Sequence, residues 1–194
     1  MKKLSKDDLM SLEDYATKRS EFREQVLAHK QPRKVQLGEH ATLYFEDRLT
    51  MQYQIQEMLR VERIFEKEAI IEELDTYNPL IPDGKNLKAT FMIEYSDEAE
   101  RRIALTKMIG IEDKVWIQIN GHDKVYAIAD EDLERDNEQK TSAVHFMRFE
   151  FNDDMVKDAQ SGKPMAMGVE HQAYTETLEP ISIESRDSLV EDFA

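Results

Sequence analysis

Apolar residues recur every three or four positions in the first part of the chain, which is the period of an amphipathic helix. One such run covers about residues 5–31 and ends before Pro32, which cannot continue a helix. A second region, about residues 48–77, contains two runs, Thr50 to Phe65 and Glu68 to Tyr77. The pattern therefore predicts N-terminal and central helices in these two regions.

From about residue 87 to residue 171 the pattern changes to short segments rich in β-branched and aromatic residues, which is typical of strands. The Asn120-Gly121 pair, flanked by two such segments, indicates a tight hairpin. Short helices are expected between the strands and over about residues 182–193, and an exposed acidic loop over Asp130 to Gln139. The predicted strands are residues 35–37, 41–45, 87–95, 115–119, 125–129, 143–151 and 164–169.

The order of these elements favours one fold class. No internal repeat and no linker divides the chain, so residues 1–194 are expected to form a single domain. Strands that follow one another as hairpins pair antiparallel. The sequence therefore predicts an α+β domain, a mostly antiparallel sheet with the N-terminal and central helices packed on it.

Composition narrows the possible functions. The chain has 26 Lys and Arg against 41 Asp and Glu, a formal net charge of −15. Such an acidic balance argues against binding nucleic acid or an anionic membrane surface, since both need clustered cations. The absence of cysteine excludes disulfides, a thiolate nucleophile and a cysteine-held iron–sulfur cluster. No apolar run is long enough for membrane insertion and no secretory signal is evident, so a cytoplasmic protein is expected.

The helix Met51 to Phe65 carries the most informative polar residues. Its apolar residues cover such a wide arc that we expect it to be mostly buried, and Gln54, Glu57 and Glu62 fall within that arc. A buried carboxylate must be paired, protonated or bound to a metal. One interpretation is a structural ion pair with Arg48, Arg60, Arg63 or Arg148. The other is a polar pocket whose carboxylate has a raised pKa.

If the helix lines a pocket, the candidate site residues are polar side chains of this helix and of the late strand: Gln54, Glu57, Arg60, Glu62, His145 and Arg148. No cofactor is predicted, and a metal remains open only if residues distant in sequence converge. The candidate ligands would be His40, His145, Glu170 and His171. No glycine-rich phosphate loop or nucleophile elbow is present, so the residues alone do not decide whether the protein is an enzyme.

Nearly the whole chain resembles a bacterial family known as domain of unknown function 3501. The Gln54–Arg60 helix is the most distinctive part of the likeness. The other matching segments are Leu4–Asp8, Leu12–Tyr15, Phe22-Arg23, Leu43–Arg48, Glu72–Leu74, Tyr77–Leu80 and Ser142–Phe149. The resemblance implies a bacterial protein of this length, often encoded beside rubrerythrin-like di-iron proteins and iron–sulfur oxidoreductases.

Two functions follow as expectations. The first is a non-enzymatic accessory protein of a peroxide-stress or electron-transfer system, whose partner is a rubrerythrin-like protein or an iron–sulfur oxidoreductase. The alternative is a small-molecule- or metal-binding enzyme or sensor, with its pocket on the Gln54–Arg60 helix. A homodimer is expected from the base rates of soluble bacterial proteins.

Overall fold

The computed structural model describes residues 2–131 and 139–193, and its strands form two antiparallel sheets. The first sheet has the order β1-β2-β3-β7-β6, and the second has the order β5-β4-β8-β9. The bounds of the first set are β1 Lys34–Leu37, β2 Ala41–Glu46, β3 Asn86–Ile93, β7 Val144–Glu150 and β6 Ile128–Ala129. Those of the second are β5 Val125–Tyr126, β4 Val115–Ile119, β8 Met165–His171 and β9 Tyr174–Leu178.

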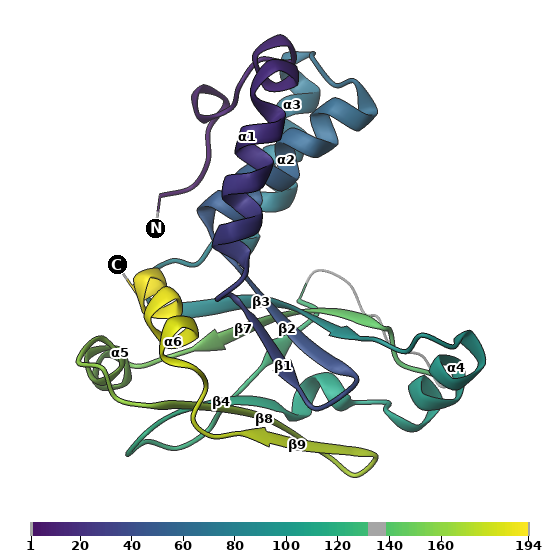
Figure 1. The fold of residues 1–194 in the computed structure, drawn as a ribbon, viewed down its shortest axis with the longest axis vertical. Helices are drawn as coiled ribbons and strands as arrows, with labels where there is room; N and C mark the ends of the chain where they lie inside the picture. Colours follow the sequence, from purple (N-terminus) through teal and green to yellow (C-terminus); the bar gives the residue numbers. More distant parts are fainter. Residues whose placement is uncertain (1, 132–138, 194) are drawn as a thin grey trace.

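The two sheets lie face to face and enclose the main hydrophobic core (Figure 1). Alternate side chains of each strand point into this core, as the two-residue period of a strand requires. On β3, for example, Leu87, Ala89, Phe91 and Ile93 are buried. The intervening residues therefore form the outer face of the first sheet.

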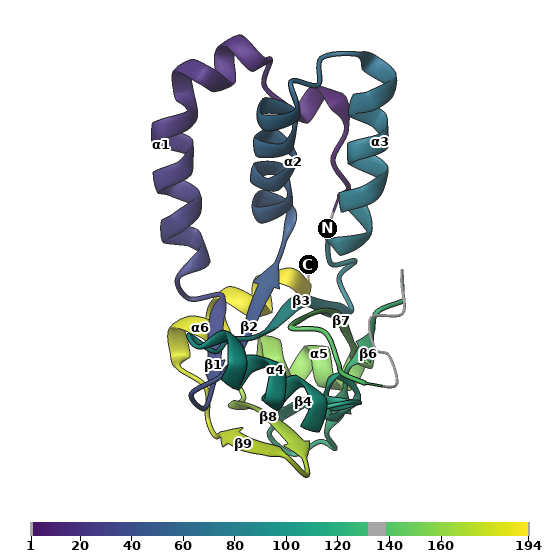
Figure 2. The ribbon, with the colours of Figure 1, turned by 90° about the vertical axis from the view of Figure 1, so that its right-hand side faces the viewer.

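Three helices stand on the side of the first sheet that faces away from the second (Figure 2). They are α1 (Leu12–Lys30), α2 (Arg48–Glu62) and α3 (Lys67–Tyr77), and we call them the helical arm. Their own core contains Met51, Ile55, Leu59, Ile70 and Leu74. Asp47 caps α2 by accepting a hydrogen bond from the amide of Thr50 at 2.9 Å.

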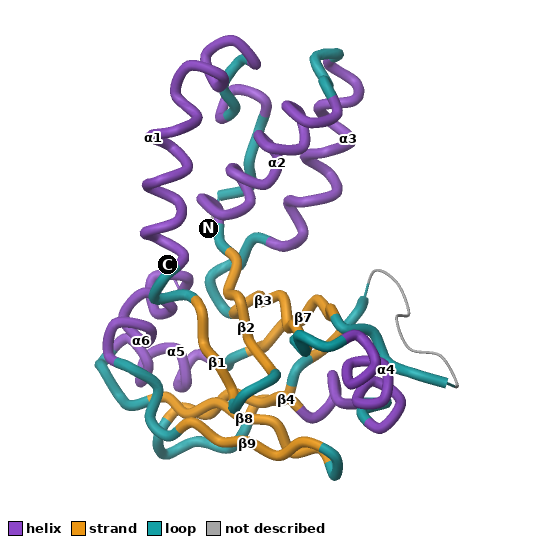
Figure 3. Tube along the Cα trace, turned by 45° about the vertical axis from the view of Figure 1, so that its right-hand side comes forward, coloured by secondary structure: helices purple, strands orange, loops and turns teal. Residues whose placement is uncertain are grey.

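The remaining helices lie at the ends of the sandwich. Helix α4 (Glu98–Lys107) lies at one end, and α5 (Asp153–Gln160) and α6 (Ile183–Val190) lie at the other (Figures 1 and 3). Short 3₁₀ turns occur at Lys6–Asp8, Asn78–Leu80, Ile111–Lys114 and Glu191–Phe193. No helix in the described part of the chain combines the length and the apolar character needed to cross a membrane.

The predicted α+β class and antiparallel pairing are confirmed. The structure adds two details. The strands divide between two sheets, and the arm helices, which stand on the first sheet, pack mainly on one another. Strand β9 was not predicted. Of the predicted acidic loop, residues 132–138 lie outside the described residues.

Candidate ligand pocket

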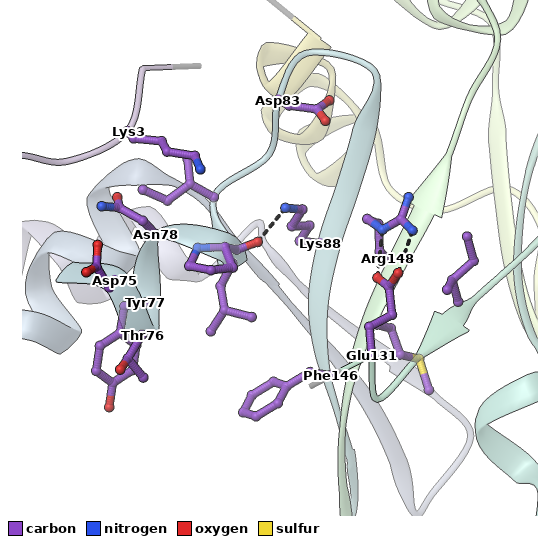
Figure 4. Close-up of a pocket in the computed structure, with 15 residues that line it drawn as sticks. Lys3, Asp75, Thr76, Tyr77, Asn78, Asp83, Lys88, Glu131, Phe146 and Arg148 are labelled. Carbon is purple, nitrogen blue, oxygen red and sulfur yellow. Dashed lines mark hydrogen bonds and ion pairs between the residues drawn. The ribbon is translucent and has the colours of Figure 1, made fainter. Parts of the chain in front are cut away.

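A hollow of about 850 Å³ lies between the helical arm and the outer face of the first sheet (Figure 4). Its apolar lining includes Leu80, Ile81, Ile128 and Phe146. Its charged lining residues are Lys3, Lys88 and Arg148 together with Asp75, Asp83 and Glu131. Three cations therefore face three carboxylates around mostly apolar walls.

The strand register determines which side chains of the first sheet line the hollow. Lys88 on β3 is opposite Arg148 on β7, which in turn is opposite Ile128 on β6. Side chains opposite one another in neighbouring strands point to the same face. Phe146, two residues before Arg148, points to that face as well. The outer face of the sheet thus presents two cations and two apolar side chains to the hollow.

The arm wall is the end of α3 and the turn that follows it. Pro79 is tolerated there because the first turn of a helix does not need its N–H. The buried amide of Asn78 accepts a hydrogen bond from the Leu4 N–H at 2.8 Å and donates one to the Leu4 carbonyl at 2.9 Å. This two-point contact holds the N-terminal segment against the arm, so that Lys3 reaches the hollow.

Lys88 is half-buried, and its Nζ donates a hydrogen bond to the carbonyl oxygen of Pro79. Among the described residues, no carboxylate oxygen lies within 4.0 Å of this ammonium group. Burial is the largest influence and lowers the pKa of Lys88. The positive charge of Arg148 acts in the same direction, whereas the charges of Asp83, Glu150 and Glu131 oppose it. The ammonium group of Lys88 therefore has carboxylates nearby but no direct ion-pair partner among the described residues.

Arg148 has a different electrostatic environment. Its guanidinium donates to both carboxylate oxygens of Glu131, each at 2.8 Å, and also pairs with Glu150. The two-point hydrogen bond from Arg148 lowers the pKa of Glu131. Arg148 and Glu131 thus neutralise one another at the edge of the hollow (Figure 4).

The hollow has the properties expected of a ligand site. Small-molecule sites typically have volumes of roughly 300–1,000 Å³, with mainly apolar walls and a few convergent polar groups. An apolar molecular body can contact Phe146, Ile128 and Leu80, while a polar group of the same molecule can reach Lys88. The arrangement suits binding, since the Glu131 carboxylate is held by Arg148 and is a poor base.

Of the predicted site residues, only Arg148 lines this hollow. On α2, Glu57 pairs with Arg19 of α1 at 2.7 and 2.8 Å, accepts a hydrogen bond from the Tyr15 hydroxyl at 2.6 Å, and contacts Arg60 at 3.3 Å. The hydrogen bond from Arg19 is the main reason that the pKa of Glu57 falls to about 2. Of the two interpretations left open by the sequence, the ion pair describes this carboxylate and the raised pKa does not.

The expectation that α2 is mostly buried was also wrong at its C-terminal end. The helix stops at Glu62, because Arg63 adopts a left-handed conformation with φ 54°. Val61 and Phe65 lie at the tip of the arm and are 61% and 73% exposed. Glu62 is exposed as well, and Gln54 is only partly buried, so neither needs a buried partner.

His145 is fully buried on β7, on the face opposite Phe146 and Arg148. Its Nδ1 lies 2.6 Å from a carboxylate oxygen of Asp130, and its Nε2 lies 3.0 Å from the hydroxyl of Thr141. These contacts belong to the interior of the sandwich. His145 is thus separated from the hollow and from α2 by the sheet itself.

The four candidate metal ligands are not brought together. The His40 ring stacks on Tyr95 with ring centroids 3.8 Å apart. Glu170 pairs with Lys124 on the outside of the second sheet, and His171 contacts the Ile109 carbonyl at 3.1 Å. Among the described residues, no group of three His, Asp or Glu side chains has the arrangement of a metal site.

Sequence reasoning missed most of the pocket residues. Lys88 is a single cation between the apolar residues Leu87 and Ala89, which marks it as an outer-face residue of a strand. Asn78 and Pro79 were noted only within the segment Tyr77–Leu80 that contributes to the family resemblance. The sequence shows the apolar and polar alternation around Lys88. It does not show that the helical arm faces this residue.

The fold and the pocket define an α+β protein in which a two-sheet sandwich carries a helical arm, with a ligand-sized hollow between them. The chain belongs to the family described as "Protein of unknown function (DUF3501)", whose profile matches residues 3–193. A solved structure from Burkholderia pseudomallei, described as a novel protein of unknown function, is 47% identical with a TM-score of 0.93. The match covers 100% of both chains. A search of curated proteins found no match.

Proposed function

We propose that this protein binds a small organic molecule with an apolar body in the hollow between the helical arm and the first sheet. The observation that carries the proposal is the combination of a volume of about 850 Å³ and apolar walls with a half-buried Lys88 whose direct contact is a backbone carbonyl. The proposal keeps the small-molecule alternative from the sequence but places its site on α3, β3, β6 and β7 instead of on α2.

A titration with N-phenyl-1-naphthylamine tests the proposal, because this neutral dye becomes fluorescent in apolar sites. We expect one dye per chain to bind. Replacing Ile128 by Asp places a carboxylate in the wall at a position that is 41% exposed, so the fold should tolerate the change. The matched control is Ile103→Asp on α4, at a position that is 55% exposed and outside the hollow.

We expect Ile128→Asp to weaken dye binding about tenfold or more, since the apolar contact is replaced by a charge that must be desolvated. Ile103→Asp should leave it unchanged. Native mass spectrometry of the purified protein adds an independent measurement, because a retained organic ligand appears as a mass increment. Absence of dye binding, or equal binding by both variants, would overturn the proposal.

A second candidate function is the accessory role, in which the protein binds a protein partner. The exposed Val61 and Phe65, four residues apart at the end of α2, favour it, since exposed apolar surface is found at interaction sites. The test is calorimetric titration with a purified rubrerythrin-like protein or iron–sulfur oxidoreductase encoded nearby, with Phe65→Ser as the variant that should lose binding. The peroxide-stress association, the cytoplasmic location and the homodimer stay predictions.

A further inference from the structure

Two cations that line the hollow, Lys88 and Arg148, and the neighbouring Lys85 outside it differ in how they are paired. Arg148 is held by Glu131 and Glu150. Lys85, three residues before Lys88, is exposed and pairs with Asp153 at 2.6 Å. Lys88 instead contacts a backbone carbonyl oxygen, that of Pro79. Within the described part of the chain, then, Lys88 is a pocket-lining cation without a carboxylate partner.

The ammonium group of lysine has three N–H donors and no acceptor. One donor of Lys88 is directed at the Pro79 carbonyl. The other two are available to a molecule in the hollow, and Figure 4 shows the amine between the arm and the Arg148–Glu131 pair. A cation that is partly removed from water and has no direct ion-pair partner gains from contact with an anionic group.

We infer that Lys88 recognises an anionic group of the ligand, and that the ligand class is an amphipathic organic anion with one negative charge. This inference rests on the proposed function, because it assumes that an organic molecule occupies the hollow. A carboxylate or sulfonate would accept the free Lys88 donors while the apolar body contacts Phe146 and Ile128.

The surrounding charges limit the ligand to a single anionic group. Because Arg148 and Glu131 are paired, the other charged lining residues are Lys88 and Lys3 against Asp75 and Asp83. These cations do not outnumber the carboxylates, and the whole chain carries a net charge of −15. A second negative charge on the ligand would therefore be repelled without a further cation to offset it. The site favours a monoanion over a dianion.

The test uses two dyes with the same apolar body. 8-Anilinonaphthalene-1-sulfonate carries a sulfonate, and N-phenyl-1-naphthylamine does not. We expect Lys88→Met to weaken binding of the sulfonate dye about tenfold or more and to leave binding of the neutral dye within about twofold. The control Lys85→Met, on the neighbouring exposed lysine, should change neither affinity. Lys88→Gln serves as a second variant if the methionine variant does not fold.

The outcomes separate the inference from the proposed function. If the wild-type protein binds neither dye, the proposed function fails and the inference fails with it. If the neutral dye binds but Lys88→Met leaves the affinity of the sulfonate dye unchanged, the hollow is a ligand site and the role of Lys88 is wrong. Loss of both dyes in Lys88→Met but not in Lys85→Met would also contradict the inference, since charge recognition would not explain it.

Discussion

The Nζ of Lys88 on β3 donates a hydrogen bond to the carbonyl oxygen of Pro79, in the 3₁₀ turn Asn78–Leu80 that follows α3. This contact joins the sheet to the helical arm across the hollow that both of them line. The position of the arm on the sheet therefore decides whether the hollow exists. Several contacts hold the arm in place, and each can be tested separately.

The two hydrogen bonds between the Asn78 side chain and the Leu4 backbone fix the N-terminal segment. Asn78→Ala removes the amide that pairs with the N–H and the carbonyl of the buried Leu4. We therefore expect the unfolding free energy to fall by about 1–3 kcal/mol. Hydrogen exchange should become faster at the amides of Leu4 and its neighbours. The exposed Asp75→Ala is the control. Unchanged protection at Leu4 would contradict this account.

The Arg19–Glu57 ion pair joins α1 to α2. Glu57→Ala removes this pair and leaves the buried Tyr15 hydroxyl without its acceptor, so we expect a loss of about 1–2 kcal/mol at neutral pH. The exposed Glu62→Ala should stay within about 0.5 kcal/mol of wild type. Urea unfolding measures both changes.

The same pair predicts a pH dependence. The folded protein lowers the pKa of Glu57 from its ordinary 4.5 to about 2. The stabilisation by Glu57 is therefore complete above the unfolded value and is lost as the pH falls through the folded value. The difference between wild type and Glu57→Ala should shrink as the pH falls from about 5 to about 2. A difference that grows in acid would contradict the assignment.

Asp192 should show the opposite dependence. It is fully buried and accepts a hydrogen bond from Arg33 at 2.5 Å, but burial is the largest influence and raises its pKa to about 6. The folded protein thus holds this proton more tightly than the unfolded chain, whose ordinary value is 3.8. The stability of wild type relative to Asp192→Asn should fall, by on the order of 2 kcal/mol, as pH rises from about 4 to about 7. Urea unfolding across this range measures it, and a rise would contradict the prediction.

Gly168 on β8 allows the single Trp to lie against the second sheet. An added Cβ would lie 2.6 Å from the Trp116 ring and 2.6 Å from the Glu176 carbonyl oxygen. Gly168→Ala should therefore cost about 2–3 kcal/mol and change the Trp fluorescence. Gly162→Ala is the control. Its φ of +91° makes any side chain there strained, but an added Cβ would have no neighbour within 4 Å. Equal spectra for Gly168→Ala and wild type would contradict the proposed contact.

The sequence predicted local structure well, because helix and strand periods are properties of neighbouring residues. The helix 50–65 and the hairpin at Asn120-Gly121 are examples. It did not predict the division into two sheets, since that depends on strand pairs such as β3 with β7 that are far apart in sequence. From the sequence we expected Arg60 as a possible partner of Glu57. We did not expect Arg19, which precedes Glu57 by 38 residues.

The pocket was missed for the same reason. Lys88 and Phe146 become neighbours only through the pairing of β3 with β7, and Pro79 faces them only because the arm stands on that sheet. The amphipathic arc of α2 was interpreted as burial, but its last apolar residues lie at the arm tip, where no described element covers Val61. Sequence periodicity shows which residues share a face, and not what that face contacts.

Methyl NMR of the protein titrated with N-phenyl-1-naphthylamine tests the central claim most directly. If the hollow between arm and sheet is the ligand site, the shifted methyl signals should be those of Leu80, Ile81 and Ile128, which line it. The methyls of Ile103 and Met108, at a smaller hollow of about 350 Å³ beside α4, should not move. Shifts confined to Ile103 and Met108, or no shifts at saturating dye, would contradict the claim.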